Sequence, residues 1–240
     1  MSIYSRVRRL TQGAGRCLAR VLLPQDCPLC AGHTRASLVC PACYASLPQL
    51  PDQRCPICAL PTPAGAICGA CLTKAPYFDA TVAGFRYAFP LDRLVQGLKY
   101  RHQLAIADWF AEALLAGSPP PGRHDLLLPL PLAPQRLAQR GFNQALEIAR
   151  PLAQALALPL APHICLRRVE APPQASLPWQ ARQANVRGAF EATRDLTGIS
   201  VLVVDDVMTT GASLNELART LKKQGAARVS NWVVARTLRD

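Results

Sequence analysis

Eight of the ten cysteines form four Cys-x-x-Cys pairs, a spacing that suits tetrahedral binding of a metal by thiolates. The pairs make two sets of four, and the second set repeats the first with a shift of 28 residues at every position. Neighbouring residues repeat too, since CPLC matches CPIC, which indicates an internal duplication. Each set is complete by itself and predicts one structural zinc ion, two in all. The predicted ligands are Cys27, Cys30, Cys40 and Cys43 in one set and Cys55, Cys58, Cys68 and Cys71 in the other.

A disulfide framework is the alternative explanation for so many cysteines. It is disfavoured because the basic N-terminus lacks the continuous apolar stretch of a secretory signal, and cytosolic thiols stay reduced. Four thiolates leave zinc no open position, so these sites stabilise a small segment rather than catalyse a reaction. No apolar stretch is long enough to span a membrane. The sequence therefore predicts a cytoplasmic protein.

A second group of chemically active residues lies in VLVVDDVMTTGAS, residues 201–213. Asp205 and Asp206 follow an apolar run of strand type, and their carboxylates can accept hydrogen bonds from neighbouring ribose hydroxyls. Residues 209–213 then turn into a helix, whose unpaired N–H groups and dipole favour a phosphate. Gly211 permits a close approach of the backbone to the anion. The whole segment predicts a site for a sugar phosphate.

Two other interpretations of this segment explain it less well. A phospho-acceptor receiver domain needs on the order of 100 further residues of doubly wound sheet after the acidic pair, and only 34 residues follow Asp206. A capped helix after a strand, with solvated acids, would explain any single feature of the segment. It does not explain all thirteen residues together.

These residues need a scaffold, and the pattern from residue 76 onward supplies one. Apolar runs of strand length alternate with helical periodicity, which predicts a parallel sheet covered on both faces. Ligands of such sheets bind beyond the carboxyl ends of the strands. The predicted strands are 81–87, 125–132 (ending near Pro129), 163–168, 199–206 and 228–238, and the predicted helices are 91–100, 104–117, 138–157 and 212–224.

The chain divides into three predicted parts. Residues 1–24 have apolar positions at helical spacing between arginines, which predicts a basic amphipathic helix; docking on the body is favoured over a membrane surface. Residues 25–75 form a double zinc ribbon, and residues 76–240 the α/β domain. Within that domain the polar, proline-bearing segment at about 169–186 predicts a mobile loop. The net charge of +12 favours polyanions such as nucleic acid, and also phosphorylated small molecules.

Residues 201–213 resemble, at every position, the phosphoribosyl-pyrophosphate (PRPP) signature of type I phosphoribosyltransferases. The paired cysteines, LKYRHQLAIADWF, PLPLAPQRLAQRGFNQALEIA and QASLPWQARQANVRGAF resemble the ComF family over essentially the whole chain. The resemblance implies a type I phosphoribosyltransferase-like parallel sheet flanked by helices, behind a small N-terminal double zinc ribbon. It also implies a cytoplasmic protein associated with DNA uptake in natural transformation. Single-stranded DNA, an uptake helicase and a recombination mediator are the partners it implies.

The resemblance assigns roles to individual residues. Asp205 and Asp206 would hold the ribose hydroxyls, in part through Mg²⁺. A proline-bearing loop, Leu132–Gln135, replaces the usual small or glycine-bearing pyrophosphate loop, and Arg136 and Arg140 are predicted to supply the missing contacts; solvated surface arginines are the alternative. Arg182, in the predicted loop, is a further pyrophosphate contact. The predicted PRPP-binding residues are completed by Val207, Met208, Thr209, Thr210, Gly211, Ala212 and Ser213.

Three functions fit these residues. The favoured one is binding of PRPP or a related sugar phosphate by a protein that handles single-stranded DNA in the cytosol. The alternative is an active phosphoribosyltransferase of nucleotide salvage, although no segment of the sequence specifies an acceptor base. A PRPP-sensing transcription regulator is disfavoured because the sequence contains no recognisable helix-turn-helix.

Overall fold

The structure is a computed structural model that describes residues 25–35, 37–168 and 186–238. The chain separates into two compact units, residues 1–47 and residues 48–240. The predicted N-terminal helix and nearly all of the predicted loop at 169–186 lie outside the described residues. In the described part of the chain, no helix has the length and apolar character needed to cross a membrane.

The first unit contains the first cysteine repeat. Strands β1 (Gln25–Asp26) and β2 (His33–Thr34) pair antiparallel, and the short helix α2 (Pro41–Ala45) follows them. Proline suits the first position of α2 because the N–H that it lacks would have no partner inside the helix.

The second repeat folds in the same way but belongs to the second unit. An antiparallel bridge joins Arg54 to Pro61, which are the positions that correspond to the Asp26–His33 pair. A single 3₁₀ turn, η1 (Pro63–Gly65), and the short helix α3 (Gly69–Thr73) follow. The duplication is therefore present in the backbone as well as in the cysteine spacing. The change between compact units nevertheless falls between the repeats, at residue 47, rather than after the second one.

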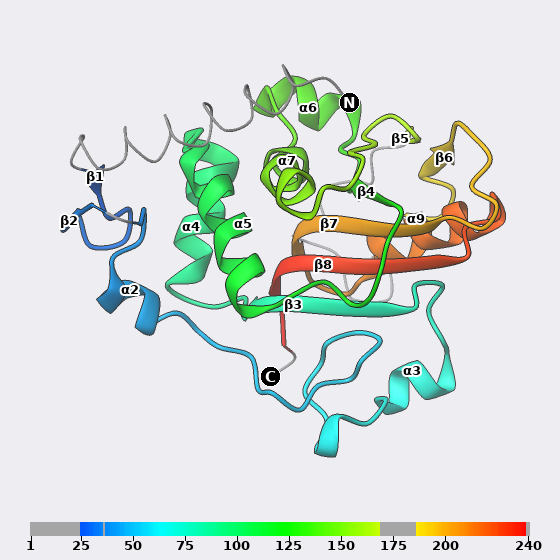
Figure 1. The fold of residues 1–240 in the computed structure, drawn as a ribbon, viewed down its shortest axis with the longest axis horizontal. Helices are drawn as coiled ribbons and strands as arrows, with labels where there is room; N and C mark the ends of the chain where they lie inside the picture. Colours follow the sequence, from blue (N-terminus) through cyan, green and yellow to red (C-terminus); the bar gives the residue numbers. More distant parts are fainter. Residues whose placement is uncertain (1–24, 36, 169–185, 239–240) are drawn as a thin grey trace. The chain divides into compact units, whose positions relative to one another are not determined.

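A four-stranded parallel sheet forms the centre of the second unit, as predicted (Figure 1). Its order is β3 (Ala80–Arg86), β8 (Arg228–Arg236), β7 (Ser200–Met208) and β4 (Leu126–Pro129). The middle strands are almost wholly buried, which is why their sequences are mostly apolar. Their buried polar residues are Asp205 and Asp206 of β7 and Ser230, Asn231 and Arg236 of β8. The ladder of β4 ends at Pro129, as the sequence predicts.

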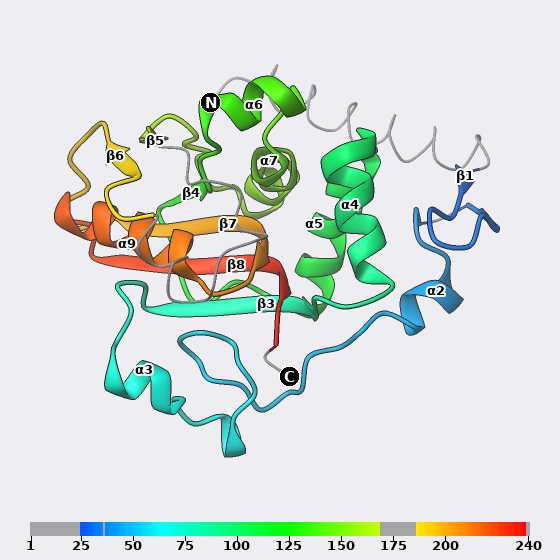
Figure 2. The same cartoon turned by 180° about the vertical axis from the view of Figure 1, so that it is seen from behind.

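Helices cover both faces of this sheet. Helices α5 (Ala105–Gly117) and α7 (Gln144–Leu156) pack on one face, with α4 (Leu91–Arg101) beside α5. Helix α9 (Ala212–Lys223) covers the other face and lies in front of the sheet when the molecule is seen from behind (Figure 2).

The prediction of a single helix at 138–157 is wrong. The segment forms two helices, α6 (Pro134–Arg140) and α7. Gly141 adopts a left-handed conformation with φ of 78° and ends α6, and the Asn143 side chain accepts a hydrogen bond from the Ala145 N–H at 3.0 Å and begins α7.

A second two-stranded sheet stands apart from the central one. The predicted strand at 163–168 exists as β5 (Cys165–Arg167), and it pairs antiparallel with β6 (Phe190–Ala192), a strand that the sequence analysis did not predict. These two strands lie on either side of the undescribed segment in the sequence.

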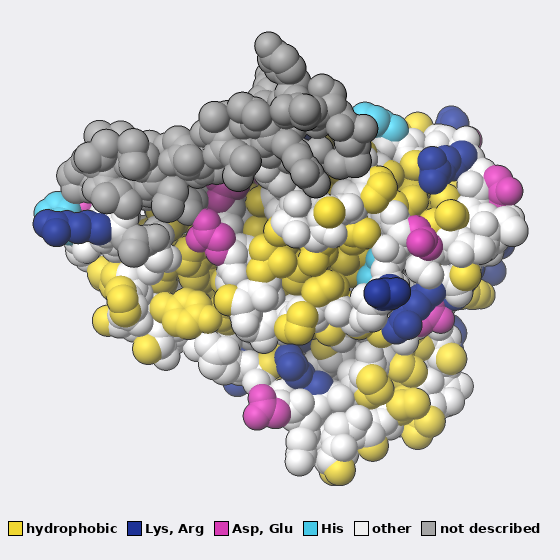
Figure 3. All heavy atoms as spheres, viewed as in Figure 1, with side chains coloured by type: hydrophobic (Ala, Val, Ile, Leu, Met, Phe, Trp, Pro, Cys, Tyr) yellow, Lys and Arg dark blue, Asp and Glu magenta, His cyan; other side chains and the backbone are white. Residues whose placement is uncertain are grey.

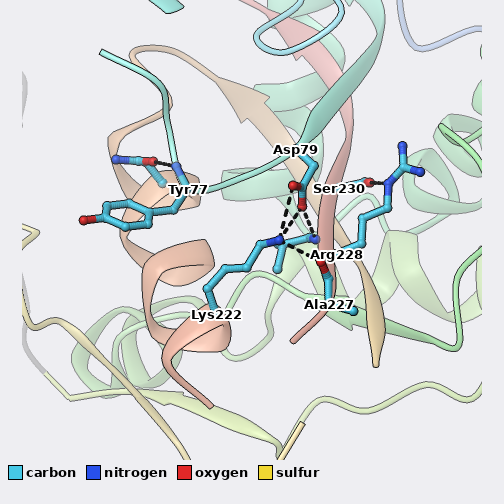
Figure 4. Close-up of polar contacts among 8 residues, drawn as sticks. Tyr77, Asp79, Lys222, Ala227, Arg228 and Ser230 are labelled. Carbon is cyan, nitrogen blue, oxygen red and sulfur yellow. Dashed lines mark hydrogen bonds and ion pairs between the residues drawn. The ribbon is translucent and has the colours of Figure 1, made fainter. Parts of the chain in front are cut away.

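Asp79 fastens the start of β3 to β8 and α9 (Figure 4). Its carboxylate accepts a hydrogen bond from the Val229 N–H at 2.7 Å and pairs with the Lys222 ammonium at 2.9 Å. The Asp79 N–H donates in turn to the Val229 carbonyl at 2.8 Å. One side chain thus joins an edge strand, a central strand and a helix.

We expect Asp79→Ala to lower the free energy of unfolding by about 2 kcal/mol, because it leaves the buried Val229 N–H without its acceptor. Urea unfolding followed by circular dichroism measures the loss as a lower midpoint at an unchanged slope. Lys222→Met is the matched control, since it removes the ion pair and keeps the Val229 hydrogen bond, and it should cost less than about 1 kcal/mol. Equal losses in the two variants would show that the backbone hydrogen bond is not the stabilising contact.

Candidate functional site

A pocket opens where β7 ends and α9 begins. It is lined by Asp205 and by the run from Val207 to Leu214, which includes every residue that the sequence predicts to hold the phosphate on this segment. The position is the carboxyl end of a central parallel strand, where α/β sheets bind ligands. Asp206 is not among the lining residues, because its carboxylate points elsewhere.

The turn into α9 needs glycine and presents N–H groups. Gly211 has φ of 79°, and a Cβ atom there would come within 2.6 Å of the Met208 Cε, so a larger residue would be both strained and obstructed. In the part of the chain that the structure describes, the N–H groups of Thr209, Thr210 and Gly211 have no hydrogen-bond partner. The first turn of α9 carries no acidic residue that would oppose an anion. The turn can therefore bind a phosphate through the backbone.

The Asp206 carboxylate forms an ion pair with the Lys99 ammonium of α4. Only 4% of the Asp206 side chain and 20% of the Lys99 side chain are exposed, so solvent screens the pair weakly. The sequence analysis missed Lys99, yet the sequence contains a signal for it. Lys99 continues the buried stripe of Leu91 and Val95 at intervals of four residues, a place where a charge needs a partner.

This ion pair gives the two neighbouring acids different pKa values. Burial raises the pKa of Asp205, and the adjacent charge of Asp206 raises it further, so the pKa of Asp205 lies well above its usual range. Burial also acts to raise the pKa of Asp206, but the charge and hydrogen bond of Lys99 outweigh it and hold that pKa below its usual value. Asp205 faces the pocket, whereas Asp206 is a paired internal charge.

Of the predicted arginines, the two that the structure describes, Arg136 and Arg140, do not line the pocket. The Arg140 guanidinium lies over the Tyr100 ring, 5.5 Å from its centre, and also donates to the Gln144 side chain. Arg136 lies on α6, and Arg182 is outside the described residues. In the proline-bearing loop Leu132–Gln135, Ala133 is buried and lies at the start of α6. The pyrophosphate role of the three arginines stays a prediction.

Both cysteine sets have the geometry of a tetrahedral metal site. Within each set all sulfur atoms lie within 4.8 Å of one another. The Cys30 and Cys40 sulfurs are 3.7 Å apart and the Cys58 and Cys68 sulfurs 3.6 Å apart. Zinc–sulfur bonds of about 2.3 Å in a tetrahedron place the sulfurs about 3.8 Å apart. The residues therefore fit two zinc ions.

The first cysteine of each set has a lowered pKa. Burial acts to raise the pKa of Cys27, but backbone N–H groups led by that of Cys40 outweigh it and bring the pKa to about 7. The same competition, led by the Cys68 N–H, brings the pKa of Cys55 to about 7. Burial raises the pKa of Cys58 to about 11, so a bound cation is needed to hold all the thiolates together.

We expect the two acids to affect stability in opposite directions. The raised pKa of Asp205 means that folding stability falls as pH rises from the unfolded-state pKa of about 3.9 toward the folded-state pKa, and Asp205→Asn removes that loss. At pH 7.5 this variant should gain on the order of 1 kcal/mol. Asp206→Asn leaves the Lys99 charge without its carboxylate and should lose about 3 kcal/mol. Thermal unfolding at pH 7.5 and pH 4.5 measures both.

The pH dependence provides the control for this prediction. The advantage of Asp205→Asn should shrink at pH 4.5, because the unfolded-state carboxyl is then closer to half protonated. A destabilised Asp205→Asn protein, or one whose advantage is independent of pH, would contradict the assignment of the charge to Asp206.

Comparison with known proteins matches both parts of the chain. Residues 18–72 match the family described as "Double zinc ribbon domain", and residues 143–239 match "Phosphoribosyl transferase domain". "DNA utilization protein YhgH" of Salmonella typhi is 33% identical over 224 residues, which cover 88% of this chain and 90% of that protein.

Two relatives have names that refer to competence. "Competence protein F" of Haemophilus influenzae (strain ATCC 51907 / DSM 11121 / KW20 / Rd) is 32% identical over 170 residues, 67% of this chain and 74% of that protein. "Competence protein ComFC" of Bacillus subtilis (strain 168) is 33% identical over 118 residues, 49% of this chain and 47% of that protein. The predicted family and fold class are thereby confirmed: with a double zinc ribbon followed by a phosphoribosyl transferase domain, the chain belongs to the ComF family, with competence protein F and DNA utilization protein YhgH as its relatives.

Proposed function

We propose that the protein binds PRPP, or a closely related sugar phosphate, in the pocket at the end of β7. The observation that carries this proposal is the lining of the pocket, in which the Asp205 carboxylate and the N-terminal turn of α9 face the same space. A carboxylate accepts hydrogen bonds from ribose hydroxyls, and a helix N-terminus binds a phosphate. A 5-phosphoribosyl group carries both features within one small molecule.

Different residues of the pocket bind different parts of the ligand. Asp205 accepts hydrogen bonds from the ribose hydroxyls, and the backbone from Thr209 to Ser213 binds the 5′-phosphate. Asp206 and Lys99 neutralise each other behind the pocket and keep the end of β7 in place. Carboxylate oxygen is the ligand type that Mg²⁺ prefers, so Asp205 suits a bound Mg·PRPP complex. Mg²⁺, when bound, neutralises part of the charge of the pyrophosphate.

The relatives support a role in DNA handling. One is named a DNA utilization protein and two are named competence proteins. The proposed role of this chain is the handling of single-stranded DNA in the cytoplasm during natural transformation, with an uptake helicase and a recombination mediator as partners. The net charge of +12 suits such a ligand. On the face shown in Figure 3, Lys and Arg side chains are scattered among hydrophobic ones instead of forming one patch, so that face is not assigned to DNA.

An active phosphoribosyltransferase is the second candidate function. The match of residues 143–239 to the phosphoribosyl transferase family favours it. Turnover of PRPP with a panel of nucleobases distinguishes the two candidates. Release of pyrophosphate that depends on one base supports the enzyme, whereas binding of PRPP without turnover supports a sensor or an adaptor.

Calorimetric titration with Mg·PRPP tests the pocket. Wild-type protein should release heat that fits one site, and Asp205→Asn should weaken binding at least about 10-fold, since an asparagine has an amide donor in place of one oxygen that can accept hydrogen bonds from the ribose hydroxyls. Asp195→Asn is the matched control, because it makes the same chemical change at an exposed aspartate outside the pocket. The absence of heat with wild-type protein would reject PRPP binding.

Fluorescence anisotropy with labelled single-stranded DNA tests the second part of the proposal. Affinity should fall steeply between 50 and 200 mM salt, with a log–log slope of about −0.7 for each phosphate contacted. A deletion that locates the contact should remove residues 1–47 only, because the second cysteine repeat belongs to the same compact unit as the sheet. Affinity that is absent, or insensitive to salt, would count against a role in binding DNA.

A further inference from the structure

The two cysteine repeats have the same spacing but different surroundings. Three cysteines of the second repeat, Cys55, Cys58 and Cys71, are buried in one hydrophobic cluster with Phe78, Met208 and Val233. The backbone joins them too, since the Thr81 N–H donates to the Pro56 carbonyl at 3.2 Å. The second repeat is therefore built into the phosphoribosyl domain, whereas the first belongs to the other compact unit.

One buried side chain connects the second repeat to the pocket. Arg236, the last residue of β8, is 3% exposed. Its Nε donates to the Cys58 carbonyl at 2.9 Å, and its Nη1 donates to the Met208 carbonyl at 3.0 Å and also to the Thr209 carbonyl. Cys58 is a predicted metal ligand, and Met208 and Thr209 line the pocket.

This connection is stiff for two reasons. A guanidinium is planar and keeps its charge at any pH at which the protein folds, so its donors reach the carbonyls in one geometry only. The Cys58 carbonyl, in turn, belongs to a tight turn closed by a 2.9 Å hydrogen bond from the Ala59 N–H to the Cys55 carbonyl. A metal held by both Cys55 and Cys58 would fix that turn.

We propose that Arg236 is a positioning residue through which the metal at the second cysteine site sets the shape of the phosphate-binding turn. The duplicated sites then have different functions: the second supports the pocket, and the first does not. The effect of this connection on ligand affinity rests on the proposed binding of PRPP, but the connection itself is a property of the protein without ligand.

Hydrogen exchange without ligand tests the connection. The variants are Cys58→Ser and, as the matched control 28 residues earlier, Cys30→Ser. At the amides of residues 207–214 that are hydrogen-bonded in the wild type, such as the Ala212 N–H, exchange should be several-fold faster in Cys58→Ser and stay at the wild-type rate in Cys30→Ser. Metal analysis should show one zinc ion lost in each variant. Equal uptake in the two variants would overturn the proposal.

Arg236→Lys keeps the proposal testable if Cys58→Ser fails to fold. A lysine retains the charge, but its single ammonium cannot reach the Cys58 carbonyl and the Met208–Thr209 carbonyls together. This variant should keep both zinc ions and the wild-type protection of α5, yet show faster exchange in residues 207–214. Unchanged exchange in residues 207–214 would overturn the proposal, because Arg236 would then not stabilise the turn. An equal rise in α5 would also overturn it, because Arg236 would then stabilise the whole domain.

Titration with Mg·PRPP separates this proposal from the proposed function. Arg236→Lys should bind about 10-fold more weakly than wild type, and Cys30→Ser should bind within about 2-fold of it. If wild-type protein binds no PRPP, the proposed function fails, and the exchange measurements still decide whether Arg236 connects the second cysteine site to the turn.

Discussion

A charge on Asp206 persists inside this protein because Lys99 lies against it. Two adjacent carboxylates at the end of a buried strand repel each other and lose hydration, so both cannot stay charged without a cation. The ion pair settles which acid is charged and leaves Asp205 facing the pocket. It also constrains the fold, because α4 must place its last turn beside the end of β7. Leu91, Leu94 and Leu98, all at most 1% exposed, hold α4 in that position.

Most of the scaffold could be predicted because its signals are local. Strands β7 and β8 contain the apolar runs Val201–Val204 and Trp232–Ala235, and α9 has its leucines on one face, so each is visible within a dozen residues. The features that sequence analysis missed depend on contacts between distant segments. Strand β6 is three residues long and exists because it pairs with β5. The place of Lys99 in the buried stripe of α4 indicates that it needs a partner, but only the structure identifies that partner as Asp206 of β7.

The break between α6 and α7 was missed for another reason. Its local signals, a glycine followed two residues later by a capping asparagine, were present in the sequence, but the apolar periodicity across them suggested one helix. In the candidate site, one continuous stretch supplies the residues that line the pocket, so the sequence singles out all of them except Leu214; Asp206, which it also predicts, does not line the pocket. Their role in binding stays a prediction. The supports of this stretch, Lys99 and Arg236, come from other strands and helices, and no spacing rule connects them to it.

The duplication shows how two similar sequences acquire different surroundings through a few residues. Asp26 of the first repeat pairs with the exposed His33 at 2.7 Å, a contact within its own small unit. Arg54 stands at the corresponding position of the second repeat, and its guanidinium donates to the Ala83 carbonyl of β3 at 3.0 Å. The change from an acid to an arginine gives the second repeat a donor that reaches the sheet. The cysteine pattern does not carry this difference.

The proposed ligand of the pocket is an anion, yet among the described residues none that lines the pocket is Lys or Arg. The Arg236 guanidinium donates to the carbonyls of Met208 and Thr209, so its charge acts on the turn although Arg236 does not line the pocket. The N-terminal end of α9 adds partial positive charge on the side that faces the pocket. Basic side chains inside so small a site would fill it and would titrate or reorient as ligands arrive. A buried guanidinium avoids both effects, because it leaves the space open and keeps its proton, so the contribution of Arg236 to the field in the pocket does not change over the physiological range of pH.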